Sequence, residues 1–115
     1  MPIIVQKSQK YLDLKERNVL RTNIVYDAHT KELINFAVIQ LFIDTDEHTH
    51  EIIKHDFSHG CYNIHRNYLG HTNRIEKPEI PLSYGLYQHA RNETRANWEE
   101  RMIQFCIRYL PKELR

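Results

Sequence analysis

Apolar and polar residues alternate in short stretches through the first part of the chain, a pattern typical of β-strands. Polar links of three or four residues separate these stretches. Links this short join antiparallel neighbours, since a parallel crossover needs about a dozen residues. The pattern therefore predicts an antiparallel four-strand meander over residues 21–70, preceded by an N-terminal segment of residues 1–20. The expected strands are residues 22–27, 32–44, 49–57 and 61–69.

The second of these stretches is apolar at consecutive positions from Phe36 to Ile43, broken only by Gln40. Side chains of a strand point alternately to its two faces, so both faces of this strand are apolar. The pattern predicts a central strand in the middle of a covered sheet.

A proline-containing loop follows, and apolar residues then recur at helical spacing. Trp98, Met102 and Cys106 are separated by steps of four residues. This spacing predicts one long amphipathic helix over residues 83–110, ended by Pro111, that lies across a face of the sheet. Because Trp98 is in step with the two other apolar residues, we expect it to be a core anchor.

Length and composition agree with one small globular domain, residues 1–115. Hydrophobic residues make up 41% of the chain and charged residues 27%, as in ordinary globular proteins. The expected fold class is α+β, with the antiparallel four-strand meander packed against one long C-terminal helix.

Charge and hydropathy exclude several broad classes. The 16 Lys and Arg residues nearly balance the 15 Asp and Glu residues, so any basic surface for nucleic acid must be local. No apolar run approaches the roughly 20 residues of a membrane helix, and we expect a cytoplasmic protein without a membrane partner. Cys61 and Cys106 lack CxxC spacing, so we expect two free thiols.

The His-rich stretch between the last two expected strands contains the candidate active site. In metal-independent cleavage of RNA, an imidazole takes the 2′-hydroxyl proton, another proton returns to the leaving oxygen, and a cation stabilises the phosphorane. His59 and His65 are the acid/base candidates, and Arg66 is the candidate phosphate ligand. Asp56 would orient an imidazole, and His55 adds a third ring to the site.

The relative positions of these residues depend on the turn. A three-residue turn at 58–60 would pair His55 with Asn63 and Ile53 with His65. His55 and His65 would then share one face of the sheet. The other face would carry Lys54, Asp56, Tyr62 and Arg66.

Substrate-binding candidates flank the same turn. Lys54 is a further cation, and Tyr62 and Tyr68 are aromatic rings on which RNA bases stack. A polar hairpin without any ligand is the competing interpretation of the whole stretch.

A metal site is a further alternative, carried by His48 and His50. Asp46, His55 or Asp56 would have to complete the ligand set, and a half set of this kind is not specific. We therefore assign no metal and no other cofactor.

Three short motifs carry a resemblance to known proteins: an Asp-x-x-His-Gly turn, a following His-Arg pair, and a helical Asn-Trp pair before a closing aromatic residue. The matching residues are Asp56, His59, Gly60, His65, Arg66, Asn97, Trp98 and Phe105. In these motifs the chain resembles a group of small uncharacterised prokaryotic proteins that is similar in layout to the TumE-type toxins of toxin-antitoxin pairs. The resemblance covers roughly residues 20–110. The chain departs from the pattern in the longer spacing between Gly60 and His65, and in Asn67, where the pattern has an acidic residue.

The resemblance implies an RNA-acting toxin, with RNA and an antitoxin protein as its partners. The alternative is a noncatalytic protein-binding module or a homo-oligomeric assembly module, such as a homodimer, that docks through its helix or a sheet edge. Whether the chain is an enzyme stays open at this point.

Overall fold

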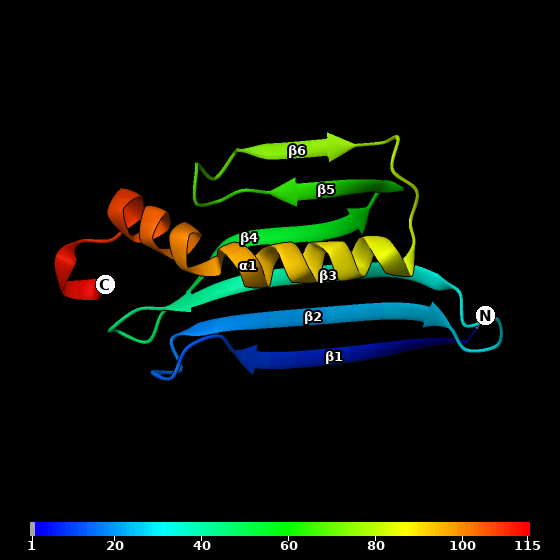
Figure 1. Ribbon diagram of the computed structural model, residues 1–115, viewed down its shortest axis with the longest axis horizontal. Helices are drawn as coiled ribbons and strands as arrows, with labels where there is room; N and C mark the ends of the chain where they lie inside the picture. The colour runs from blue at the N-terminus through cyan, green and yellow to red at the C-terminus, as the bar shows by residue number, and fades with distance from the viewer. Residues whose placement is uncertain (1) are drawn as a thin grey trace.

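A computed structural model describes residues 2–115 as an antiparallel sheet with one long helix lying across one face (Figure 1). Each strand pairs with the next along the chain, so the sheet is a six-strand meander. The strands are β1 (Ile3–Tyr11), β2 (Asn18–Asp27), β3 (Leu33–Ile43), β4 (Thr49–Ser58), β5 (Cys61–His65) and β6 (Arg74–Lys77). The helix α1 (Tyr84–Tyr109) is followed by the short 3-10 helix η1 (Lys112–Leu114). The predicted α+β class, the antiparallel order and the long C-terminal helix are confirmed.

The predicted number of strands is wrong, because the sheet has one more strand at each edge. β1 lies within residues 1–20, which the sequence pattern left outside the sheet, and β6 lies beyond residue 70. Both edge strands are rich in polar residues, as strands with one unpaired side commonly are. Their weak hydrophobic alternation explains why the pattern missed them.

A β-bulge in β4, opposite β3, lets the sheet contact the helix along its length. The pairing moves from Gln40 opposite Ile53 to Leu41 opposite Glu51, which leaves Ile52 as an extra residue. Ile52 packs with the end of α1, whereas Ile53 lies among side chains from its middle. Both isoleucines are buried against the helix for this reason.

The core lies between the sheet and α1 in two clusters. The first consists of Leu20, Phe36, Val38, Tyr62, Leu86, Tyr87 and Ala90. The second consists of Phe42, Ile52, Phe105, Cys106 and Leu110. The prediction that Trp98 is a core anchor is wrong, because its side chain is half-buried and belongs to neither cluster. Its backbone carbonyl faces the sheet instead and accepts a hydrogen bond of 2.8 Å from Nε2 of Gln40.

Among residues 2–115 no helix lies on the opposite face of the sheet, so α1 covers one face only (Figure 1). Of the apolar side chains of β3 on that face, Leu41 is buried, and Ala37, Ile39 and Ile43 are half-buried. We call this surface the helix-free face.

Local sequence determines where α1 begins and ends. Ser83 is the N-cap, and its Oγ accepts a hydrogen bond of 3.0 Å from the backbone N–H of Leu86. Leu110 is the C-cap, and Pro111 cannot continue the helix. Within residues 2–115, no helix is long and apolar enough to cross a membrane.

Candidate functional site

The β4–β5 turn has two residues, His59 and Gly60, in place of the expected three. Ser58 pairs with Cys61, and both turn residues have positive φ values, 55° for His59 and 70° for Gly60. Two successive positive φ values define a type I′ turn, whose twist matches that of a hairpin. The predicted register is therefore wrong by one residue.

This shift decides which predicted site residues lie together. His55 now pairs with Ile64 and shares its face with Tyr62, under α1. Lys54 pairs with His65. The structure therefore brings His55, Tyr62, Tyr68 and Arg66 together on the helix side and places Lys54, Asp56 and His65 on the helix-free face.

His55 is buried between the sheet and the helix, with 2% of its surface exposed. Its Nδ1 lies 2.7 Å from the hydroxyl oxygen of Tyr62 on the neighbouring strand. Its Nε2 lies 3.2 Å from Oε2 of Glu93 on α1 but, among the described residues, makes no hydrogen bond. The ring therefore connects β5 to the helix and retains one unpaired nitrogen.

Burial controls the protonation of this pair. It lowers the pKa of His55 to about 3, with a further contribution from the nearby charge of Arg101, and raises the pKa of Tyr62 to about 12. At neutral pH the imidazole is therefore neutral, and Tyr62 keeps its proton. In the tautomer with the ring proton on Nε2, the Tyr62 hydroxyl donates to Nδ1, and the Nε2–H faces the Glu93 carboxylate without a hydrogen bond.

Arg101 holds Glu93 in place two turns further along the helix. Its Nη1 donates to Oε2 of Glu93 at 2.9 Å, and its Nη2 donates to Oε1. The guanidinium carbon lies 5.5 Å from the ring centre of Tyr68, which packs against it. The opposite charges of Arg101 and Glu93 largely cancel. The net charge of the cavity therefore depends on its other side chains.

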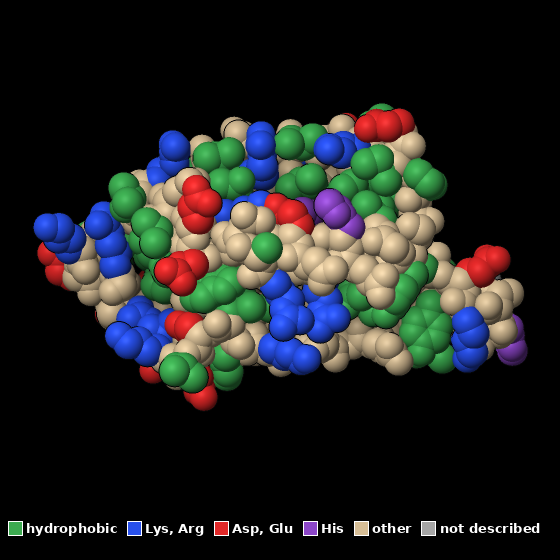
Figure 2. Space-filling model, viewed as in Figure 1, with side chains coloured by type: hydrophobic (Ala, Val, Ile, Leu, Met, Phe, Trp, Pro, Cys, Tyr) green, Lys and Arg blue, Asp and Glu red, His purple; other side chains and the backbone are tan. Residues whose placement is uncertain are grey.

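The residues around His55 enclose a cavity of about 250 Å³ between α1 and strands β4–β6. Its cationic lining consists of Arg66, Lys77 and Arg101, and His89 and Glu93 line it from the helix. Figure 2 shows histidine, acidic and basic side chains meeting in the hollow between α1 and β5. With Glu93 and Arg101 paired, Arg66 and Lys77 give this hollow, which we call the helix-side cavity, a positive balance.

A second polar cluster surrounds Asp56 on the helix-free face. Its Oδ1 accepts from Oγ of Ser58 at 3.0 Å and from Nδ2 of Asn63 at 3.3 Å. Its Oδ2 lies 3.6 Å from Nζ of Lys54 and 3.7 Å from Nε2 of His65. The suggested role of Asp56 as a partner for an imidazole therefore has a matching geometry with His65, on the far side of the sheet from His55.

His59 and the residues of the metal hypothesis lie elsewhere. His59 is exposed at the tip of the turn. Nε2 of His50 lies 2.8 Å from Oδ2 of Asp44, and Nδ1 of His48 lies 3.8 Å from the same oxygen. Within residues 2–115 no group of three or more His, Cys, Asp or Glu side chains is arranged to hold a metal ion.

Sequence reasoning missed the helical half of the helix-side cavity. His89, Glu93 and Arg101 are separated by four and eight residues, so they lie on one face of α1. That spacing was the available signal, since three chemically active side chains share the helix face that meets the His-rich strands.

Comparison with protein-family models, curated proteins and solved structures gives no match. The function is therefore argued from the geometry of the site.

Proposed function

We propose that the protein acts on RNA, holding a backbone phosphate in the helix-side cavity and cleaving the chain without a metal. The observation that carries the proposal is the buried Nε2 of His55, which makes no hydrogen bond within the described chain although Glu93 lies 3.2 Å away. The nitrogen lines a cavity together with Arg66 and Lys77, which form no ion pair among the described residues. A buried donor without an acceptor costs about 1–3 kcal/mol, so such a group calls for an explanation. A phosphate oxygen would supply the missing acceptor.

The proposed reaction is an internal transesterification. The 2′-oxygen bonds to phosphorus while the bond from phosphorus to the 5′-oxygen breaks, which gives a 2′,3′-cyclic phosphate and a 5′-hydroxyl. One proton leaves the 2′-hydroxyl and one arrives on the 5′-oxygen, so no oxidant, reductant or further reactant is needed.

The lining residues suit separate roles in this reaction. His89 is exposed at the cavity mouth, so its imidazole is available to take the first proton and deliver the second. Arg66 and Lys77 would stabilise the charge of the phosphorane. His55 cannot donate a proton as an acid at neutral pH, because its pKa lies near 3, and its role is to hold a phosphate oxygen by a hydrogen bond.

The test is cleavage of a labelled single-stranded RNA by the purified chain. His89→Ala or Arg66→Ala should each reduce the rate by about a hundredfold, as expected for loss of an acid/base group or a charge-stabilising group. His59→Ala and His65→Ala are matched controls, since both remove a histidine outside the cavity.

The outcomes separate the candidate sites. Loss of activity in His65→Ala and Asp56→Ala, with full activity in His89→Ala, would move the reaction to the helix-free face. Absence of cleavage by the chain, alone and after release from any bound partner, would refute the proposal.

The kind of RNA-acting protein that we propose is a toxin-type ribonuclease with a protein antitoxin, to which the motifs around Asp56 and His59 point. In its support, growth arrest on expression of the chain should be relieved by His89→Ala. Arrest of the same strength by the variant would count against a toxin that acts through this cavity.

A noncatalytic assembly module is the second candidate, and one observation favours it. Ile3, Val5 and Tyr11 are exposed apolar residues on alternate positions of the edge strand β1. Alternation directs all three to the helix-free face, where Val5 lies opposite Val25 and Tyr11 lies opposite Val19 of β2. An exposed apolar edge of this kind is a pairing surface for a second copy. If it is used, Val5→Lys should convert a dimer into a monomer in light scattering, and a monomeric wild type would refute it.

A further inference from the structure

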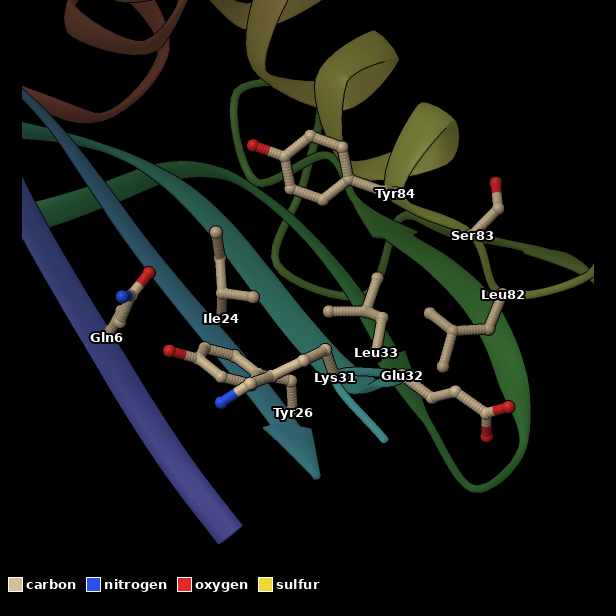
Figure 3. Close-up of a pocket in the computed structure, with 9 residues that line it drawn as sticks. All are labelled: Gln6, Ile24, Tyr26, Lys31, Glu32, Leu33, Leu82, Ser83 and Tyr84. Atoms are coloured by element: carbon tan, nitrogen blue, oxygen red, sulfur yellow. The ribbon is translucent and has the colours of Figure 1, made fainter. Parts of the chain in front are cut away.

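A groove runs along the other flank of α1, between the helix and strands β1 and β2. It consists of two adjoining hollows of about 630 Å³ and 410 Å³, which share Gln6 and Ile24 as lining residues. Figure 3 shows the larger hollow, which lies below the N-terminal end of α1. We call the two hollows together the β1–β2 groove, and it is separate from the helix-side cavity.

The charged residues that line this groove are predominantly basic. Lys7, Lys10, Lys31 and Arg91 line it, and none of them forms a salt bridge within residues 2–115. Glu32 is the one acidic residue among the lining residues, all of which belong to the described part of the chain. Figure 2 shows basic side chains gathered along this flank of α1. With a net charge of only +1 over the whole chain, the gathering is local, as a nucleic-acid surface requires in such a protein.

Aromatic rings accompany these cations. Tyr84 is 56% exposed and projects over the hollow that Ile24 and Leu33 line (Figure 3). Tyr26 lies in the same hollow, and Nζ of Lys31 is 5.9 Å from the centre of its ring. An exposed ring above an apolar floor, with a cation alongside, suits a planar base attached to a phosphate.

From this arrangement we infer that the β1–β2 groove binds single-stranded RNA, with bases stacked on Tyr84 and Tyr26 and phosphates next to Lys10, Lys31 and Arg91. The inference rests on the proposed function, because it supplies the surface that holds the RNA beyond the phosphate at the reacting centre. An unpaired strand is required, since bases in a duplex present no free face to a tyrosine.

The experiment measures binding apart from cleavage. A fluorescein-labelled 2′-O-methyl RNA oligonucleotide cannot undergo the internal transesterification, and its fluorescence anisotropy reports its affinity for the full chain. Tyr84→Ala should weaken binding about tenfold, whereas Tyr84→Phe should bind like the wild type because the ring is retained. Arg91→Ala should reduce the slope of log K against log salt concentration by about 0.7, the value for one phosphate contact on a single strand.

Arg21→Ala is the matched control, because Arg21 is an exposed arginine of β2 on the helix-free face. Equal weakening by Arg21→Ala and Arg91→Ala would overturn the inference, as would equally tight binding of duplex RNA or equally effective displacement by polyglutamate.

The two proposals fail separately. Binding that depends on Tyr84 without cleavage of ordinary RNA would refute the catalytic function alone. Cleavage that depends on His89 with unchanged binding in the Tyr84 and Arg91 variants would refute the groove alone.

Discussion

The buried imidazole of His55 should make the protein less stable as the pH falls. In the unfolded chain a histidine has a pKa of about 6.5, whereas burial lowers the pKa of His55 to about 3 in the folded chain. Between these values the unfolded state binds a proton that the folded state does not bind. Stability is therefore complete above the unfolded pKa and declines as the pH falls toward the folded one.

The expected magnitude follows from the two pKa values. Each pH unit inside the window costs up to about 1.4 kcal/mol, so lowering the pH from 7 to 5 should remove about 2 kcal/mol of the free energy of unfolding. Arg101 and His89 oppose the charged ring, and Asp56 favours it. Glu93 lies 3.2 Å away, but its charge is already engaged by Arg101.

Urea denaturation at both pH values measures this loss, with His55→Gln as the control. The variant keeps the contributions of the other ionisable groups, so the difference between its pH dependence and that of the wild type isolates His55. Equal pH dependence in the two proteins would refute the reasoning. So would a His55 ring proton that titrates near pH 6.5 by NMR, the value for an unburied imidazole.

Four further substitutions test the fold by urea denaturation. Phe36→Ala should cost about 3–5 kcal/mol because the ring is fully buried, whereas Trp98→Ala should cost less because its side chain is only partly buried; equal costs would contradict the assigned core. His59→Asn should stabilise the hairpin by up to about 1 kcal/mol, because Asn before Gly60 is favoured in a type I′ turn, and a loss of stability would argue against that turn. Ser83→Ala should cost about 1 kcal/mol through the lost N-cap, and an unchanged stability would show that the cap contributes nothing.

Strong periodicity was sufficient to predict the centre of the fold. The alternation from residue 33 to 57 and the four-residue steps before Pro111 correspond to β3, β4 and α1. The edge strands β1 and β6 were not predicted, because a strand with one unpaired side carries many polar side chains and shows little hydrophobic alternation. The burial of Trp98 was predicted wrongly for another reason. Helical spacing states which residues share a face, but the rotation of α1 against the sheet, with the Trp98 carbonyl bound to Gln40, is a tertiary property.

Which residues share the candidate site depends on the register of β4 against β5, and a turn of two or three residues shifts this register by one. The amino-acid composition does not determine the length of the turn. The sequence identified His55, Tyr62, Arg66 and Tyr68 as candidates, and these do share the helix-side cavity. It placed His55 on one face with His65, however, because it counted Ser58 into the turn, and a shift of one residue exchanges every side chain between the faces.

The same register places a polar side chain from each neighbouring element beside His55. Tyr62 on β5 is hydrogen-bonded to one ring nitrogen, and Glu93 on α1 lies 3.2 Å from the other without a hydrogen bond. When the Tyr62 hydroxyl donates to Nδ1, the ring proton is on the nitrogen that faces Glu93. A histidine held in this way is unsuited to carry protons to and from a substrate, but it is well suited to present a fixed N–H to an anion. The proton-carrying role therefore falls to an imidazole in contact with solvent, and among the residues lining the cavity, all within the described chain, His89 is the one that meets this condition.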